Sequence, residues 1–92
     1  MAKSNSGNLL ATIAGAGLAV TGIAHFFVPT VFRGITETAF PDDPEQALKV
    51  NGTIEAAVGA AIAVPKTRKV GLIGLGAYIA YLAANTAKAR RR

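Results

Sequence analysis

The stretch LLATIAGAGLAVTGIAHFFV, residues 9–28, decides the fold class of this chain of 92 residues. It holds twenty consecutive residues without Asp, Glu, Lys or Arg, and Pro29 closes it. Twenty helical residues extend over about 30 Å, which is the thickness of the hydrocarbon core of a bilayer. The stretch therefore predicts a membrane-crossing helix over residues 9–28.

Two further apolar stretches follow the first one. Residues 48–64 carry Glu55 inside the run and end before Pro65, and residues 70–87 contain no charged side chain. A soluble three-helix bundle would need charged outer faces, which the first and third runs lack. Asp43 and Pro44 are typical of an N-cap and a first helical residue. We therefore predict an all-α membrane protein with a single domain, residues 1–92, whose three transmembrane helices cover about residues 9–28, 45–64 and 70–87.

The segments outside these helices are short. The residues after Pro29 predict a short interfacial segment, and residues 88–92 form a basic tail. Basic clusters at the ends of apolar runs are typical of membrane helices. Such a tail either attracts anionic lipid or simply anchors the last helix. Lys and Arg divide almost evenly between the two predicted sides, so the positive-inside rule does not predict the orientation.

The composition excludes several functional classes. The chain is 51% hydrophobic and only 16% charged, which excludes a disordered protein. It has no Cys and one His, which argues against a disulfide scaffold and against thiolate or His-rich metal sites. Its net charge of +5 comes from clusters at the helix ends, so nucleic acid is not a predicted partner. No nucleophile–base pair, phosphate-binding loop or set of metal ligands occurs in the sequence, and we do not expect an enzyme.

Small residues recur at spacings of three and four in each predicted helix. Such rows let the backbones of membrane helices approach closely, and packing then replaces the hydrophobic driving force that lipid removes. We therefore predict close helix contacts along three rows, which are Gly15, Ala19 and Gly22; Gly52, Ala56, Gly59 and Ala60; and Gly76, Ala80 and Ala84.

Five of the polar side chains inside the predicted spans form a group that the topology places in one leaflet. Glu55 lies about 10 Å into the second helix, where a carboxylate tends to face a partner or a cavity. The cluster is either a hydrogen-bond network that joins three helices or a pocket for a polar headgroup, with which Glu55 and His25 exchange protons. Its members are His25, Asn51, Glu55, Tyr81 and Asn85.

The order of several short motifs resembles the DoxX-like family of small bacterial membrane proteins. The motifs are His25-Phe26-Phe27-Val28-Pro29 followed by Phe32, then Asn51-Gly52-Thr53-Ile54-Glu55 with Gly59, then Pro65-Lys66-Thr67-Arg68, then Ala84-Asn85. The resemblance covers residues 9–88 and implies a membrane helical bundle, with His25, Glu55, Arg68 and Asn85 at the family's characteristic positions. Some members are linked to quinol oxidation or to membrane redox complexes. Members typically have four spans, so a chain with three spans would need a partner to cover its open face.

These observations lead to three functional hypotheses. The first is an accessory or interaction subunit of a larger assembly, such as a respiratory or redox complex, in the bacterial inner membrane. Its expected partners are membrane lipids and other membrane subunits or further copies of the chain. The second is a redox component of the DoxX type that binds a quinone or a lipid. The third is a phage-type holin, which also has three spans, a similar length and a basic tail.

Overall fold

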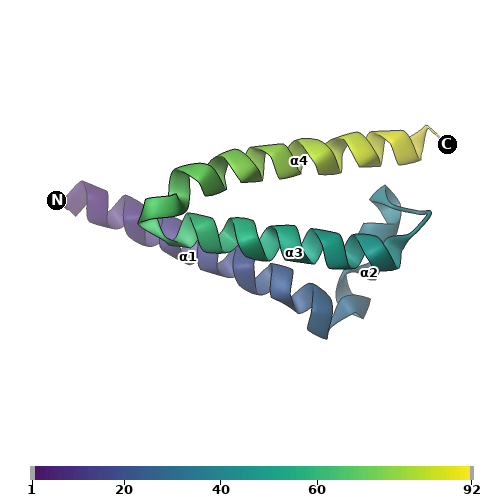
Figure 1. Ribbon diagram of the computed structural model, residues 1–92, viewed down its shortest axis with the longest axis horizontal. Coiled ribbons are helices and arrows are strands. Elements are labelled where there is room, and N and C mark those ends of the chain that lie inside the picture. Colours follow the sequence, from purple (N-terminus) through teal and green to yellow (C-terminus); the bar gives the residue numbers. More distant parts are fainter. Residues whose placement is uncertain (1, 92) are drawn as a thin grey trace.

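The computed structural model describes residues 2–91, with side chains from residue 6 onward, and it is helical except for short connections. Arg92, the last residue of the predicted basic tail, lies outside the described residues. The all-α prediction is confirmed. Figure 1 shows the helices, which are α1 (Ala2–Phe27), α2 (Pro29–Ala39), α3 (Pro44–Ala63) and α4 (Arg68–Arg90), with the 3₁₀ turn η1 (Pro65–Thr67) before α4.

The helix boundaries follow the signals in the sequence. Asp43 caps α3, since its side chain accepts a hydrogen bond from the backbone N–H of Gln46 at 3.1 Å. Proline stands at the start of α2, α3 and η1, where its missing N–H costs nothing. The helices α1 and α4 extend beyond the predicted ranges because a helix does not end where its residues become polar.

The segment after α1, predicted as a short interfacial segment, is a helix of eleven residues, α2. It runs across the end of α3 toward α4 (Figure 1). Its inner side carries the buried Thr36, while Val31 is 67% exposed on the outer side. An ion pair joins Arg33 on α2 to Glu45 at the start of α3. These contacts hold α2 against the remaining helices.

The backbones of α1 and α3 touch each other in an antiparallel arrangement. A Cβ atom added at Gly15 would lie 2.7 Å from the Gly59 carbonyl oxygen. One added at Gly22 would lie 2.5 Å from the Gly52 carbonyl oxygen. Only glycine fits at such positions, because any larger residue would force the helices apart. The predicted contact rows on α1 and α3 are confirmed at these four glycines.

The predicted contact row on α4 does not contact another described helix of the chain. Gly76 has open space around it, and Ala80 and Ala84 are exposed. The face of α4 that contacts α3 instead carries Gly71 and the buried Tyr78. Residues 76 and 78 point in nearly opposite directions on a helix, since successive residues are rotated by about 100°. Beyond this contact, α4 diverges from α3 toward its C-terminal end (Figure 1).

Arg68 joins the ends of three helices at the side opposite to α2. Its Nε donates to the carbonyl oxygen of Ile62 at 2.7 Å, and Nη2 donates to that of Ala63 at 3.3 Å. These carbonyls belong to the last turn of α3, which has no intrahelical donors left for them. The same guanidinium donates to Asn8 Oδ1 at 2.8 Å and to Thr12 Oγ1 at 3.0 Å on α1. Arg68 is therefore a structural clamp.

Large apolar side chains lie mostly on the outside of the molecule. Among the described side chains, Ala47, Leu48, Ile62 and Tyr78 form the whole buried hydrophobic core. Sixteen large aliphatic and aromatic side chains are exposed, with Phe27 at 79% and Ile35 at 78%. Two helical stretches, Ser6–Phe27 and Pro65–Arg90, are long and apolar enough to cross a membrane. The helix α3, which carries Lys49, Asn51 and Glu55, is not among them.

The contact between α1 and α3 predicts the effect of a single methyl group. Gly59→Ala places a Cβ against the Ala19 backbone and the Gly15 carbonyl oxygen. We expect it to lower the free energy of unfolding by about 1–3 kcal/mol. Gly17→Ala is the control, since Gly17 has nothing within 4 Å and alanine is the better helix former. Unfolding in detergent, followed by circular dichroism, measures both, and equal stability of the two variants would contradict the packing.

Candidate functional site

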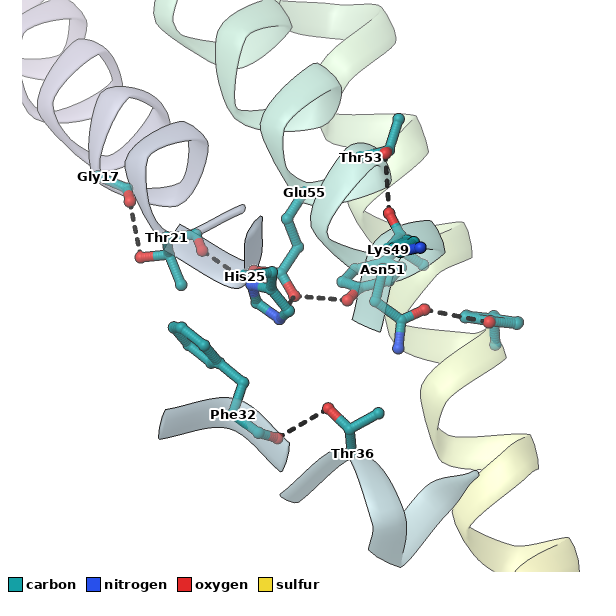
Figure 2. A network of polar contacts seen from close by, with 11 residues as sticks. Gly17, Thr21, His25, Phe32, Thr36, Lys49, Asn51, Thr53 and Glu55 are labelled. Atoms are coloured by element: carbon teal, nitrogen blue, oxygen red, sulfur yellow. Dashed lines mark hydrogen bonds and ion pairs between the residues drawn. The ribbon is translucent and has the colours of Figure 1, made fainter. Parts of the chain in front are cut away.

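A pocket of about 440 Å³ lies where α4 diverges from α3, and side chains from all four helices line it. The polar side chains of the lining come from all four helices, and the apolar ones come from α2, from the residue after it and from α4. The lining includes His25, Phe32, Thr36, Asn51, Glu55 and Tyr78. Figure 2 shows the polar contacts around this pocket.

Glu55 is the centre of the polar contacts. Its Oε2 accepts a hydrogen bond of 2.5 Å from the Tyr78 hydroxyl on α4. The same oxygen lies 3.8 Å from Nε2 of His25 on α1. The Glu55 side chain is only 13% exposed, and its other oxygen, Oε1, has no hydrogen-bond partner among the described residues. Glu55 therefore joins three helices through one oxygen and leaves the second one available.

His25 is held in one orientation by contacts on two sides. Its Nδ1 lies 2.8 Å from the carbonyl oxygen of Thr21, one turn earlier on α1. A carbonyl oxygen only accepts, so Nδ1 carries the proton and Nε2 faces Glu55. The ring stacks on Phe32 of α2, with centroids 4.0 Å apart and an angle of 15° between the planes. These contacts direct Nε2 toward the carboxyl group.

Asn51 lies one turn before Glu55 on the same face of α3. Its Oδ1 accepts a hydrogen bond of 3.1 Å from the Tyr81 hydroxyl. Its amide nitrogen, which points away from that bond in Figure 2, has no partner among the described residues. The residue is only 4% exposed, yet no described side-chain nitrogen or oxygen is both fully buried and unpaired. The amide nitrogen therefore opens into the pocket.

The five residues predicted to cluster do not all meet. His25, Asn51 and Glu55 line the pocket, and Tyr81 reaches it through its bond to Asn51. Asn85 is the exception, because its side chain donates to the backbone carbonyl of Tyr81 at 2.8 Å. It lines a separate cavity of about 290 Å³ together with Asp43 and Lys88. Asn85 is therefore not among the residues that line the pocket with Glu55.

Tyr78 belongs to the site although the sequence argument assigned it no role there. The short turn at residues 64–67 sets the register between α3 and α4. It places Tyr78 opposite Glu55 and Tyr81 opposite Asn51. A count outward from that turn would have found both pairs. Phe32 and Thr36, on α2, required knowledge of how that helix turns back over the others.

Arg68 lies at the other end of the helices and has no contact with the pocket. The resemblance to DoxX-like proteins implied that Arg68, like His25 and Glu55, is one of the family's characteristic positions. Here its four hydrogen bonds account for it as a structural residue. Within the described residues, no group of three or more His, Cys, Asp and Glu side chains is placed to hold a metal ion.

One protein family matches the chain. The family model described as "Domain of unknown function (DUF8561)" matches residues 14–92, which include every helix except the first turns of α1. No curated protein and no solved structure matches the chain. The resemblance to DoxX-like proteins stays a prediction.

The bond between Tyr78 and Glu55 predicts a specific coupling between the two residues. In a double-mutant cycle, Tyr78→Phe and Glu55→Gln should show a coupling energy of about 1–2 kcal/mol in the free energy of unfolding. The matched cycle of Tyr81→Phe with Glu55→Gln should give a value near zero, since the Tyr81 hydroxyl bonds Asn51 instead. Detergent unfolding of the six proteins measures both. Equal coupling in the two cycles would refute the arrangement.

Proposed function

We propose a function for this chain, which belongs to the family described as "Domain of unknown function (DUF8561)", from its exterior and its pocket. The chain is a small integral membrane protein of three membrane-crossing helices, and it binds the headgroup of an amphiphilic ligand inside one leaflet. A bacterial inner membrane is the location that the sequence resemblance suggests. The unpaired polar atoms of Glu55 and Asn51 in the pocket carry the proposal.

The exterior supports insertion into lipid. Only 17% of the apolar window of α1 and 11% of that of α4 are buried, so neither helix is the core helix of a soluble bundle. In water, such a surface would be an apolar patch of a size that monomeric soluble proteins rarely expose. In a bilayer the same side chains are solvated by lipid tails.

The helix α3 is the third span in this proposal. Its twenty residues reach about 30 Å, which is enough to cross. Its polar residues argue against a lone helix in lipid, yet Asn51 and Glu55 face α1 and α4 rather than the outside. Ionisable groups inside membranes usually face the interior of a bundle in this way. The neighbouring helices therefore make the crossing of α3 possible.

The pocket suits a molecule with a polar head and an apolar tail. His25, Asn51 and Glu55 supply polar groups, and Ile35, Phe40 and other apolar side chains supply the remaining wall. A quinone or a lipid has this general form. Glu55 and His25 beside the headgroup would exchange protons with a redox-active ligand, which links the pocket to the hypothesis of a redox component.

Ligand extraction tests this function. After carbonate washing, the chain should stay with the membranes, and an amphiphile should copurify with it after solubilisation. Glu55→Gln and His25→Ala should reduce the amount of that amphiphile roughly tenfold by mass spectrometry, the loss expected for one hydrogen bond to a charged group. Glu37→Gln is the matched control, because Glu37 lies on α2 with its side chain 51% exposed. Unchanged ligand content in both pocket variants would remove the proposal.

A second candidate function is an accessory subunit of a larger membrane assembly. The outer face of α4 supports it, because Gly76, Ala80 and Ala84 form a row of small residues that no described helix covers. Rows of this kind receive another membrane helix. The partner in this proposal is a helix of another subunit. No particular contact favours the holin hypothesis.

A bulky residue on this row tests the second candidate. Gly76→Leu should abolish photo-crosslinking from position 80 to a partner in native membranes, because the side chain blocks the approach of a helix. Gly17→Leu is the control, since Gly17 also has open space but lies on α1. Crosslinking that survives in Gly76→Leu would exclude this face, and a product with twice the mass of the chain would identify the partner as a second copy.

A further inference from the structure

We infer that the pocket selects an uncharged headgroup with a hydroxyl, either an alcohol or a phenol, and discriminates against anionic, cationic and acceptor-only headgroups. This inference rests on the proposed ligand-binding function and names the class of ligand. Three observations carry it: the charges around the pocket, the free hydrogen-bonding atoms, and the apolar remainder of the wall.

An anionic headgroup finds no counter-charge in this pocket. None of the residues that line it is Lys or Arg. The basic residue of α2, Arg33, is instead paired with Glu37 and Glu45 on the exposed side of that helix. A phosphate or carboxylate would lie beside Glu55, where like charges repel strongly because the surroundings are poorly polarisable.

A cationic headgroup is also poorly matched. The titratable groups that face Glu55 are His25 from α1 and Tyr78 from α4, while none of the pocket-lining residues of α2 is titratable. The Tyr78 hydroxyl already donates to Oε2 of this carboxyl group, and the His25 ring lies 3.8 Å from the same oxygen, so a cation finds this side of the group occupied. An ammonium group has donors only, so the amide nitrogen of Asn51 would remain without an acceptor.

A hydroxyl group satisfies both free atoms. Glu55 Oε1 and the Asn51 amide nitrogen lie one helical turn apart, on the same face of α3 and at the same pocket. A hydroxyl has one donor and two acceptor positions. It donates to an ionised Glu55, or accepts from a protonated one, and in either case it accepts from Asn51. A quinone carbonyl only accepts hydrogen bonds. It therefore fits beside a protonated Glu55 but not beside an ionised one.

The rest of the wall suits the apolar part of such a ligand. Ile35, Phe40 and Leu82 line the pocket away from the polar atoms. Buried polar groups that lack a partner are costly, so a site of this kind discriminates strongly against a ligand without the matching group. Selectivity for the headgroup therefore follows from Asn51 and Glu55, and the tail contributes affinity without discrimination.

A panel of ligands with one common tail tests the inference on the full chain in phosphatidylcholine nanodiscs. The probes are dodecanol, a dodecylphenol, dodecanoate, dodecyltrimethylammonium and a dodecylbenzoquinone. The readout is the NMR signal of the Asn51 side-chain amide, which reports on the site itself rather than on partition into lipid. The Asn85 amide is the internal control, because it bonds the Tyr81 backbone outside the pocket.

The inference predicts that one or both hydroxyl probes shift the Asn51 amide signal, with affinities at least about tenfold above those of the other three probes. The shift should persist in Asn85→Leu. If a charged probe or the quinone binds as tightly as the hydroxyl probes, the inference is wrong and the ligand-binding function stands. If no probe moves the Asn51 signal, the ligand-binding function itself is wrong.

Discussion

The apolar exterior of this small protein is the constraint from which the rest of its structure follows. The large aliphatic and aromatic side chains point outward, and the polar side chains of Asn51 and Glu55 point inward. In water, the burial of apolar surface is the main source of favourable free energy for folding. A protein with its large apolar side chains outside would obtain little of that free energy. In lipid the exterior is already solvated, so cohesion must come from close packing and internal hydrogen bonds. Both are present, in the glycine contacts and in the polar pocket.

The glycine contacts between α1 and α3 determine where the polar groups meet. Because the two backbones touch near Gly22 and Gly52, His25 lies beside Gly52, and its Nε2 is 3.8 Å from the carboxyl oxygen of Glu55, about one turn further along α3. The turn at Pro65 then sets the register of α4 and places Tyr78 against Glu55. At the other end of the helices, Arg68 donates hydrogen bonds to the last carbonyl groups of α3 and to Asn8 on α1. The positions of the pocket residues thus depend on helix contacts made by residues that do not line the pocket.

Much of the helical framework was predictable from the sequence. Apolar runs and proline positions identified the long helices, and Asp43 correctly predicted the start of α3. The contact rows on α1 and α3 were predictable because each helix offers one continuous row of small residues. On α4, small residues occur on two faces, and composition alone does not choose between Gly71 and Gly76. The choice depends on Tyr78, whose bond to Glu55 turns the opposite face inward.

The candidate site was only partly predictable, for a geometric reason. A shared leaflet requires only that helix ends lie on one side of the membrane, and this placed His25, Asn51 and Glu55 correctly. It says nothing about the angle between helices, and here Asn85 is not among the residues that line the pocket with Glu55. The cavity itself exists because α4 diverges and α2 turns back over the gap, and neither feature leaves a pattern in the sequence. The pairing of Tyr78 with Glu55 could have been predicted by counting outward from the turn between α3 and α4.

The depth of α3 in the bilayer tests the central claim most directly. The chain has no native cysteine, so spin labels on single cysteines at Gln46, Ala57 and Lys66 report on these positions alone. The account predicts that Ala57, near the middle of α3, is accessible to oxygen dissolved in lipid and protected from a water-soluble nickel chelate. The two outer positions should show the opposite pattern. Contact of the nickel chelate with all three positions would place α3 in water and contradict the account.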